Sequence, residues 1–272
     1  MPPAIPDEQA ALLAAIVADP DDDTPRLVYA DWLQENGDEE QAACIRESIR
    51  VARLPEPERR EAVKHLRSEQ ETKGPKWLEA IEVCGTEGFD FSDLRWPPDA
   101  VIYRSTGEFF EDVPTLFARV PVRDLAIYWF HSRGLDAAAL RQLAVMPELA
   151  RLHTLRLGNY GHEIDLAAWA ELLRSTHLRG LHRLECGQTL FEAHAFALAE
   201  CENLSGLTEL NLRDNEITAT GALAVLMSPH FAGVTRLTFA GNDISEHDPN
   251  YQTLVTGYTA RFGSDELLFN RL

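Results

Sequence analysis

The sequence predicts an α/β protein in which an N-terminal bundle of helices is followed by a short solenoid of strand–helix units. Two observations lead to this prediction. Over the first 85 residues, apolar side chains recur with the spacing of amphipathic helices. Beyond about residue 115, an apolar pattern recurs around positions 125, 155, 184, 210 and 237, and such regular recurrence indicates a stack of repeats. We therefore expect parallel strands on the concave side of the solenoid and helices on its convex side.

The N-terminal bundle is predicted to contain four helices. Apolar positions 12, 13, 16 and 17 mark the first helix, and positions 27, 28, 32 and 33 mark the second. The second helix is expected to begin with Thr24 as its N-cap and Pro25 at its first position, and to end at Gly37. The third helix covers positions 42 to 52, the fourth begins after Pro57, and the segment around Trp77 is expected to close the bundle.

A change of composition separates the two halves of the chain. Residues 85 to 98 read GTEGFDFSDLRWPP, a run of glycine, proline and aromatic residues that is typical of a junction, and a short strand is expected at 101–103. The predicted domains are residues 1–85 for the helical bundle, 86–115 for the junction, 116–245 for about five repeats and 246–272 for a C-terminal cap.

The repeat itself is most regular near its C-terminal end. Residues 207–217 read LTELNLRDNEI and match the pattern LxxLxLxxNxL at each fixed position, and residues 234–244 read VTRLTFAGNDI, with only apolar exchanges. Ala- and Leu-rich segments such as LAAWAELLRS lie between the copies and have helical periods. From about residue 115 to 245 the chain resembles leucine-rich repeat proteins of the ribonuclease-inhibitor type. This resemblance implies units of strand, turn and helix that are stable only when stacked.

Asn215 and Asn242 occupy the asparagine position of the LxxLxLxxNxL pattern. A tight turn follows each strand there, and its backbone groups would be buried without partners. We predict that the side-chain amides of these two residues satisfy those groups and have no catalytic role.

The N-terminal half has a resemblance of its own. The run from Leu12 to Arg46, LLAAIVADPDDDTPRLVYADWLQENGDEEQAACIR, is similar to the repeat-companion domain that precedes leucine-rich or WD repeats in large bacterial paralogue families. Residues 65–81, HLRSEQETKGPKWLEAI, resemble the closing helix of that domain. Residues 88–104 depart from the basic Arg-Gly-Phe element that relatives often carry. The resemblance implies an architecture and no established activity.

Amino-acid composition limits the classes of molecule that this protein is expected to bind. The chain has 25 Lys and Arg against 44 Asp and Glu, a net charge of −19, so nucleic acids and anionic membrane surfaces are unfavourable partners. No signal peptide is recognisable and no stretch is apolar enough for a membrane span. The four cysteines are far apart and form no CxxC pair, which favours reduced thiols over disulfides. We expect a cytoplasmic protein without a cofactor.

Candidate catalytic and metal-binding residues are few. Asp19, Asp21 and Asp23 have the spacing of a calcium loop, but position twelve would be Ala30 where a bidentate Glu is needed, so helix capping is the favoured role. The nine histidines lack paired metal-ligand spacing, and no metal site is predicted. An alternative hypothesis places an enzymatic or regulatory site in the N-terminal half.

That alternative site would use two carboxylates spaced four residues apart on the second helix, Asp31 and Glu35, with Tyr29 or Arg46 as further members. Like charges at this spacing are also typical of an ordinary solvated helix face. A pocket that gathers these groups would favour the alternative, and an exposed helix with separated carboxylates would count against it.

Alternate strand residues project from the concave side and form columns across the stack. One column is predicted to hold residues 124, 154, 183, 209 and 236, the next 126, 156, 185, 211 and 238, and a third 128, 158, 187, 213 and 240. Their charges alternate in sign, so they form either a self-neutralising ladder or a surface that binds a partner. The residue types favour partner binding, because Tyr, Trp and Arg are enriched in interface hot spots. The predicted partner-binding residues are Tyr128, Trp129, Arg156, Arg183, Glu185, Glu209, Asn211, Arg213 and Arg236.

Taken together, these patterns predict a non-enzymatic adaptor or scaffold that presents its concave face to a protein partner, with a monomer as the favoured state. Gly158 and Gly187 are expected to leave room beside Tyr128, while Trp129 has the alternative of packing into the core of the first repeat. The first forty residues contain eleven acids and one base, Arg26. This acidic segment either steers a basic partner or serves solubility alone.

Overall fold

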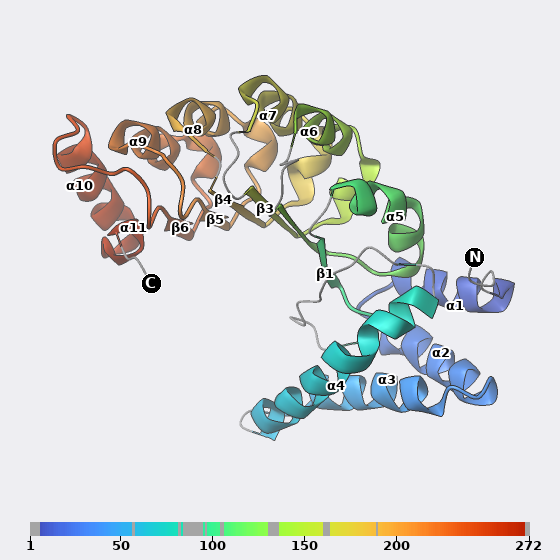
Figure 1. Ribbon diagram of the computed structural model, residues 1–272. Coiled ribbons are helices and arrows are strands. Elements are labelled where there is room, and N and C mark those ends of the chain that lie inside the picture. The colour runs from blue at the N-terminus through green and yellow to red at the C-terminus, as the bar shows by residue number, and fades with distance from the viewer. Residues whose placement is uncertain are drawn as a thin grey trace. The chain divides into compact units, whose positions relative to one another are not determined.

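The computed structural model describes residues 6–55, 58–80, 83, 95, 97–103, 106–129, 136–159, 164–188 and 190–269. The chain forms two compact units, Met1–Ala126 and Ile127–Leu272. Helices come first, and six strands that alternate with helices follow (Figure 1). None of the described helices is both long enough and apolar enough to cross a bilayer.

The first unit begins with four helices, α1 (Asp7–Ala18), α2 (Asp23–Glu35), α3 (Glu39–Ala52) and α4 (Glu58–Ala80). The strand β1 (Ala100–Tyr103), the helix α5 (Thr106–Arg119) and the strand β2 (Asp124–Trp129) follow them. The four predicted helices and the predicted short strand at 101–103 are confirmed. The fourth predicted helix and the segment around Trp77 are one continuous helix of 23 residues.

The apolar positions that marked the helices form the core of this unit. Leu13 and Ile16 of α1 are fully buried, as are Tyr29 of α2 and Ile45 of α3. The helix α1 packs against both α2 and α5, and α3 packs against α2 and α4. The spacing of one apolar residue every three or four positions therefore gives each helix one buried face, as expected for amphipathic helices.

The start of α2 differs from the prediction. The N-cap is Asp22, not Thr24: the Thr24 backbone N–H donates to Asp22 Oδ1 at 2.9 Å and the Thr24 hydroxyl donates to the same oxygen at 2.8 Å. A carboxylate at this position reaches two donors of the first turn, so the helix begins two residues earlier than Pro25 suggested. The end is as predicted, with Gly37 at φ +90°, a conformation that glycine adopts without steric cost.

The second unit repeats a strand, an α-helix and a short 3₁₀ helix. Its α-helices are α6 (Ala137–Ala144), α7 (Leu166–Leu173), α8 (Glu192–Ala199), α9 (Ala219–Met227), α10 (Tyr251–Phe262) and α11 (Glu266–Phe269). Its strands are β3 (Thr154–Asn159), β4 (Arg183–Gly187), β5 (Glu209–Asn211) and β6 (Arg236–Thr238). The 3₁₀ helices, which the sequence patterns did not reveal, are η1 (Pro147–Arg151), η2 (Thr176–Gly180), η3 (Glu202–Leu204) and η4 (Pro229–Phe231).

The strands form one sheet in the order β1-β2-β3-β4-β5-β6, and β3 to β6 pair in parallel. Within the second unit, the strands lie on the inner, concave side and α6 to α9 lie on the outer, convex side (Figure 1). This arrangement confirms the predicted α/β class and is consistent with a short leucine-rich repeat solenoid.

The register of the strands is the one that the repeat predicts. Leu155, Leu184, Leu210 and Leu237 are paired neighbours on successive strands, and none of them is more than 3% exposed. Because side chains alternate along a strand, burying this column places the residues on either side of each leucine on the opposite face. The first two predicted columns are therefore confirmed from β3 to β6, whereas the third is paired only at Gly158 and Gly187, because β5 and β6 end before Arg213 and Ala240.

The two asparagines join neighbouring repeats, as predicted. Asn215 Nδ2 donates to the carbonyl oxygens of Cys186 at 2.7 Å and Leu212 at 2.9 Å, and Asn215 Oδ1 accepts from Leu190 N–H at 2.9 Å. Asn242 accepts from Ile217 N–H at 3.0 Å and donates to Leu212 O at 2.7 Å. Backbone groups that each turn would otherwise leave unpaired are thus satisfied across the repeat boundary.

Candidate binding surface on the concave face

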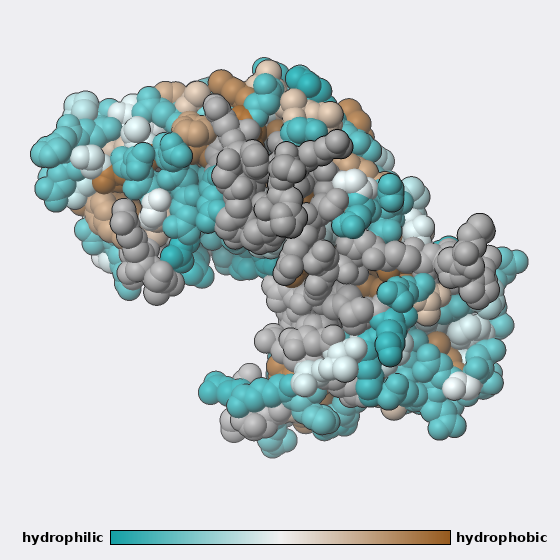
Figure 2. Space-filling model, in the orientation of Figure 1, coloured by the Kyte–Doolittle hydropathy of each residue, from teal (hydrophilic) through white to brown (hydrophobic). Residues whose placement is uncertain are grey.

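The concave face consists of the side chains that strands β2 to β6 direct away from the leucine column. Figure 2 shows hydrophilic side chains beside β5 and β6, whereas hydrophobic ones are visible on the outer surface of α6 and α7. Tyr128, Arg156, Arg183, Glu185, Glu209, Asn211 and Arg213 are all partly exposed, and Arg236 is exposed. Trp129 belongs to β2, but its side chain lies outside the described residues.

Part of the predicted charge ladder is present. Arg183 Nη2 lies 2.8 Å from Glu209 Oε2 on the next strand, and Arg156 Nε lies 4.0 Å from Glu185 Oε2. Arg236, the third member of the predicted ladder, forms no ion pair among the described residues, and Arg213 Nε donates to Asp214 of its own repeat at 3.0 Å. Exposed pairs of this kind contribute at most about 1 kcal/mol to stability.

The structure brings four of the predicted binding residues together around one small cavity. Tyr128, Glu185, Asn211 and Arg213 line a space of about 80 Å³. The other residues of its wall are Leu157, Gly158, Gly187, Gln188 and Asp214. Arg183, Glu209 and Arg236 are on the same face but do not line this cavity.

Gly158 determines where the Tyr128 ring lies. A Cβ atom at position 158 would approach Tyr128 Cδ1 to 2.6 Å, which is closer than non-bonded carbon atoms can pack. The ring therefore lies directly against the backbone of β3. The expected room beside Tyr128 is confirmed, and the tyrosine fills part of it.

Gln188 and Asp214 are members of the cavity wall that sequence patterns did not reveal. Both have left-handed backbones, with φ of +66° and +55°, and they lie at equivalent positions of their repeats, directly after Gly187 and Arg213. Gly241 takes the same position in the next repeat, with φ +77°. The repeat thus requires this conformation, and a Cβ atom at Gly241 would clash with the Asp214 carboxylate at 2.1 Å.

The chemistry of this cavity suits recognition. Its described lining residues supply two carboxylates, a guanidinium, a phenol and two amides, and none of them is a serine, cysteine or histidine that could act as a nucleophile with a base. Within the described part of the chain, no group of three or more His, Cys, Asp and Glu side chains is placed to hold a metal ion. Polar side chains around an aromatic ring can fix the orientation of a bound group.

The residues of the alternative N-terminal site do not gather. Tyr29 is fully buried, and its hydroxyl accepts a hydrogen bond from Gln9 Nε2 at 3.0 Å; burial raises the pKa of Tyr29 to about 12. Asp31 and Glu35 are exposed, and Asp31 forms a 2.7 Å ion pair with Arg46. Residues two apart on a helix do not share a face, which separates Tyr29 from Asp31.

The acidic run before α2 serves capping and ion pairing. Asp22 caps the helix, and Arg123 binds both carboxylate oxygens of Asp21 at 2.8 and 2.9 Å. This bond with the Arg123 guanidinium lowers the pKa of Asp21. Asp23 pairs with Arg53, and Arg95 Nε lies 3.2 Å from its other oxygen. The capping role predicted for Asp19, Asp21 and Asp23 is therefore wrong in detail: the intervening Asp22 caps α2, and Asp21 and Asp23 bind arginines instead.

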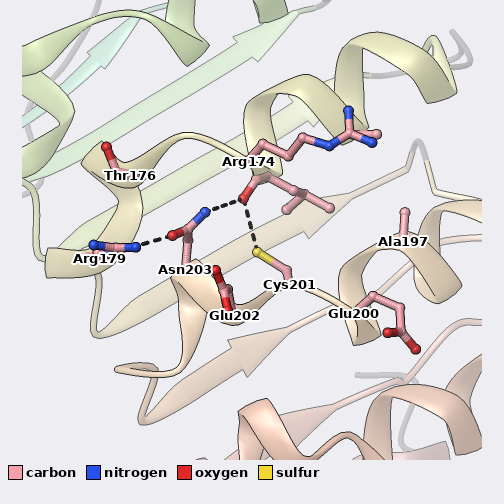
Figure 3. A pocket seen from close by; sticks show the side chains of 10 residues that line it. Arg174, Thr176, Arg179, Ala197, Glu200, Cys201, Glu202 and Asn203 are labelled. Carbon is pink, nitrogen blue, oxygen red and sulfur yellow. Dashed lines mark hydrogen bonds between the residues drawn. The ribbon is translucent and has the colours of Figure 1, made fainter.

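A larger cavity of about 430 Å³ lies on the convex side between α7 and α8 (Figure 3). Asn203 occupies its centre: it accepts from Arg179 Nε at 3.0 Å and donates to the Leu173 carbonyl at 3.2 Å. Cys201 Sγ donates to the same carbonyl at 3.1 Å. Figure 3 shows Arg174 pointing away from this network. The central polar groups are bonded to one another, which leaves them little capacity for a ligand.

The cysteine in this cavity is not a reactive thiol. Cys201 is 6% exposed, and burial raises its pKa, so the thiol is protonated at neutral pH. Cys44 and Cys186 are likewise buried and free of disulfides. The fourth cysteine, Cys84, lies outside the described residues.

Comparison with protein-family models and with curated proteins finds no match for this chain. The fold by itself does not specify a function, because repeat architectures of this class carry many unrelated ones. The function therefore has to be inferred from the residues of the concave face.

Proposed function

We propose that the protein is a non-enzymatic interaction module, an adaptor or scaffold, whose concave face binds a protein partner. One observation carries the proposal: four of the nine residues predicted for partner binding on the concave face, Tyr128, Glu185, Asn211 and Arg213, line a single cavity. They come from four different positions along the chain, so only the stacking of repeats brings them together.

The two resemblances support this proposal. The strand–helix stack resembles leucine-rich repeats, and the helical half resembles the repeat-companion domain. Stacked repeats form extended concave surfaces because each unit adds one strand and a small rotation. Such a surface offers a partner many weak contacts around a few strong ones.

The cavity is small enough to take a single side chain of the partner. Tyr128 is the natural hot spot, because an aromatic ring held against a strand loses little entropy on binding. Arg213 and Asp214 flank it with paired charges that accept or donate hydrogen bonds. The ladder of Arg183 and Glu209 then forms the polar rim that typically surrounds an interface core.

The test is affinity capture from native-host lysate with the whole chain and with the Arg156→Glu/Arg213→Glu double variant. We expect the whole chain to retain a specific protein and the double variant to lose it, because reversing both charges places like charges beside Glu185 and Asp214. Recovered proteins are identified by mass spectrometry, and the interaction is then measured with the purified pair.

The matched control is Arg141→Glu/Arg174→Glu, which changes the net charge equally at two exposed positions of the convex side, Arg141 of α6 and the Arg174 C-cap of α7. Equal loss of capture by both double variants would show that overall charge, not the concave face, governs binding. Capture that survives the concave substitutions contradicts the proposal, provided that both variants unfold at the temperature of the unmodified chain.

A further inference from the structure

A third cavity in the second unit has a different character from the two described above. It measures about 450 Å³ and lies at the end of the repeat stack, between the last repeat and α10. Two small apolar residues complete a wall whose other members are Thr235, Arg236, Tyr258, Arg261, Phe262 and Ser264. The volume falls within the range of sites for small organic ligands.

The charge of this wall is opposite to that of the protein. Among the described residues it contains two arginines and no Asp or Glu, in a chain whose net charge is −19. Long-range repulsion from the rest of the protein disfavours casual binding of anions. An anion that binds here must therefore do so through local contacts.

Arg261 supplies a fixed positive charge. Its guanidinium donates to the carbonyl oxygens of Leu226 and Val234, each at 3.0 Å, and of Phe231. It also lies 5.0 Å from the centre of the Phe262 ring. Because carbonyl oxygens hold the guanidinium without neutralising it, the charge remains available to a ligand.

Arg236 supplies a second, adaptable charge. It is exposed on β6, and its paired neighbour Glu209 is bonded to Arg183 at 2.8 Å. Among the described residues, no carboxylate lies within ion-pair distance of Arg236. The charges of Arg236 and Arg261 both act to lower the pKa of Tyr258, although burial has the larger effect and raises it to about 12. Both arginines line the cavity together with Tyr258.

The remaining wall provides an apolar surface and one free hydroxyl. Tyr258 is buried and its hydroxyl donates to the Leu237 carbonyl, so the ring presents carbon atoms to the cavity. Phe262 is partly exposed beside it. The Thr235 hydroxyl already donates to Thr208 O at 3.1 Å, whereas the Ser264 side chain is exposed and has no bonded partner in the described structure.

We propose that this cavity binds a small organic anion, in which a carboxylate or phosphate group is attached to an apolar group. The oxygens contact Arg236 and Arg261, whose planar guanidinium groups match oxyanion geometry, and the apolar part packs on Tyr258 and Phe262. This site is separate from the Tyr128 cavity and does not depend on a protein partner.

The test is calorimetric titration of the full-length protein with phenyl phosphate, benzoate and inorganic phosphate. We expect saturable binding of at least one aromatic anion, weaker binding of inorganic phosphate, and a loss of roughly tenfold in affinity for Arg236→Gln, since it removes one charge-assisted contact. The comparison between phenyl phosphate and benzoate identifies which oxyanion the site prefers.

The matched control is Arg174→Gln, which removes an equal charge from an exposed convex position. Its affinity should stay within about twofold of the unmodified chain, as expected for a distant and screened charge. Absence of saturable binding of either aromatic anion, or equal weakening by the two variants, overturns the proposal. Inorganic phosphate that binds as tightly as phenyl phosphate overturns the assignment of an apolar group.

Discussion

The concave cavity around Tyr128 and the convex cavity around Asn203 are built from the same repeats, yet their polar groups are used differently. On the convex side, Arg179, Asn203 and Cys201 bond to one another or to the Leu173 carbonyl. On the concave side, the Glu185 and Asp214 side chains keep 37% and 48% of their surface in solvent. The larger cavity is therefore the poorer binding site, because recognition depends on available partners and not on volume.

The stack of leucines supports both cavities, so disturbing it should affect them together. Leu210→Ala removes most of a buried side chain and should lower the free energy of unfolding by about 2 to 5 kcal/mol. Denaturant unfolding measures this change. A loss below about 1 kcal/mol would mean that the repeat stack contributes less to stability than its register indicates.

Gly158→Ala alters the concave cavity but not the convex one, and so tests the concave cavity by itself. The added Cβ atom must push the Tyr128 ring away, so we expect partner capture to weaken by roughly tenfold at a stability cost of about 1 to 3 kcal/mol. Gly233→Ala is the control, because its Cβ atom would lie 3.6 Å from the Leu207 carbonyl oxygen, an ordinary van der Waals contact. Unchanged capture by Gly158→Ala would show that Tyr128 is not part of the binding surface.

Asn203→Ala tests the convex network in isolation. It deletes the bonds to Arg179 and to the Leu173 carbonyl, but Cys201 still donates to that carbonyl, so the free energy of unfolding should fall by only about 1 kcal/mol. Partner capture should not change. Weakened capture without loss of stability would indicate that the partner binds on the convex side.

The smallest effect is expected from the concave ladder. Arg183→Gln removes the exposed pair with Glu209 and should change the free energy of unfolding by less than about 1 kcal/mol. A double-mutant cycle with Glu209→Gln isolates the pair energy. A coupling energy well above that value would show that the ion pair mainly stabilises the fold, and would contradict its role as the solvent-exposed rim of a binding surface.

Several local features depended on groups that sequence patterns do not connect. Asp22 displaced Thr24 as the cap of α2 because its carboxylate reaches two donors at once. Asp21 forms an ion pair with Arg123, which lies about one hundred positions away in the chain. Gln188 and Asp214 lie in the cavity wall because their backbones are left-handed. Their residue types did not predict this position.

The sequence alone determined the α/β class, the four N-terminal helices, the register of β3 to β6 and the structural role of Asn215. These features follow from periodicity, because burying one leucine per strand settles which neighbouring residues face solvent. Only the tertiary structure decided which residues of these faces come together: Tyr128 against Gly158, Arg213 with Asp214, and Arg236 in the same cavity wall as Arg261. The physical reason is that periodicity assigns a face to each side chain, while the contacts between exposed side chains depend on turns, rotamers and the closeness of neighbouring repeats.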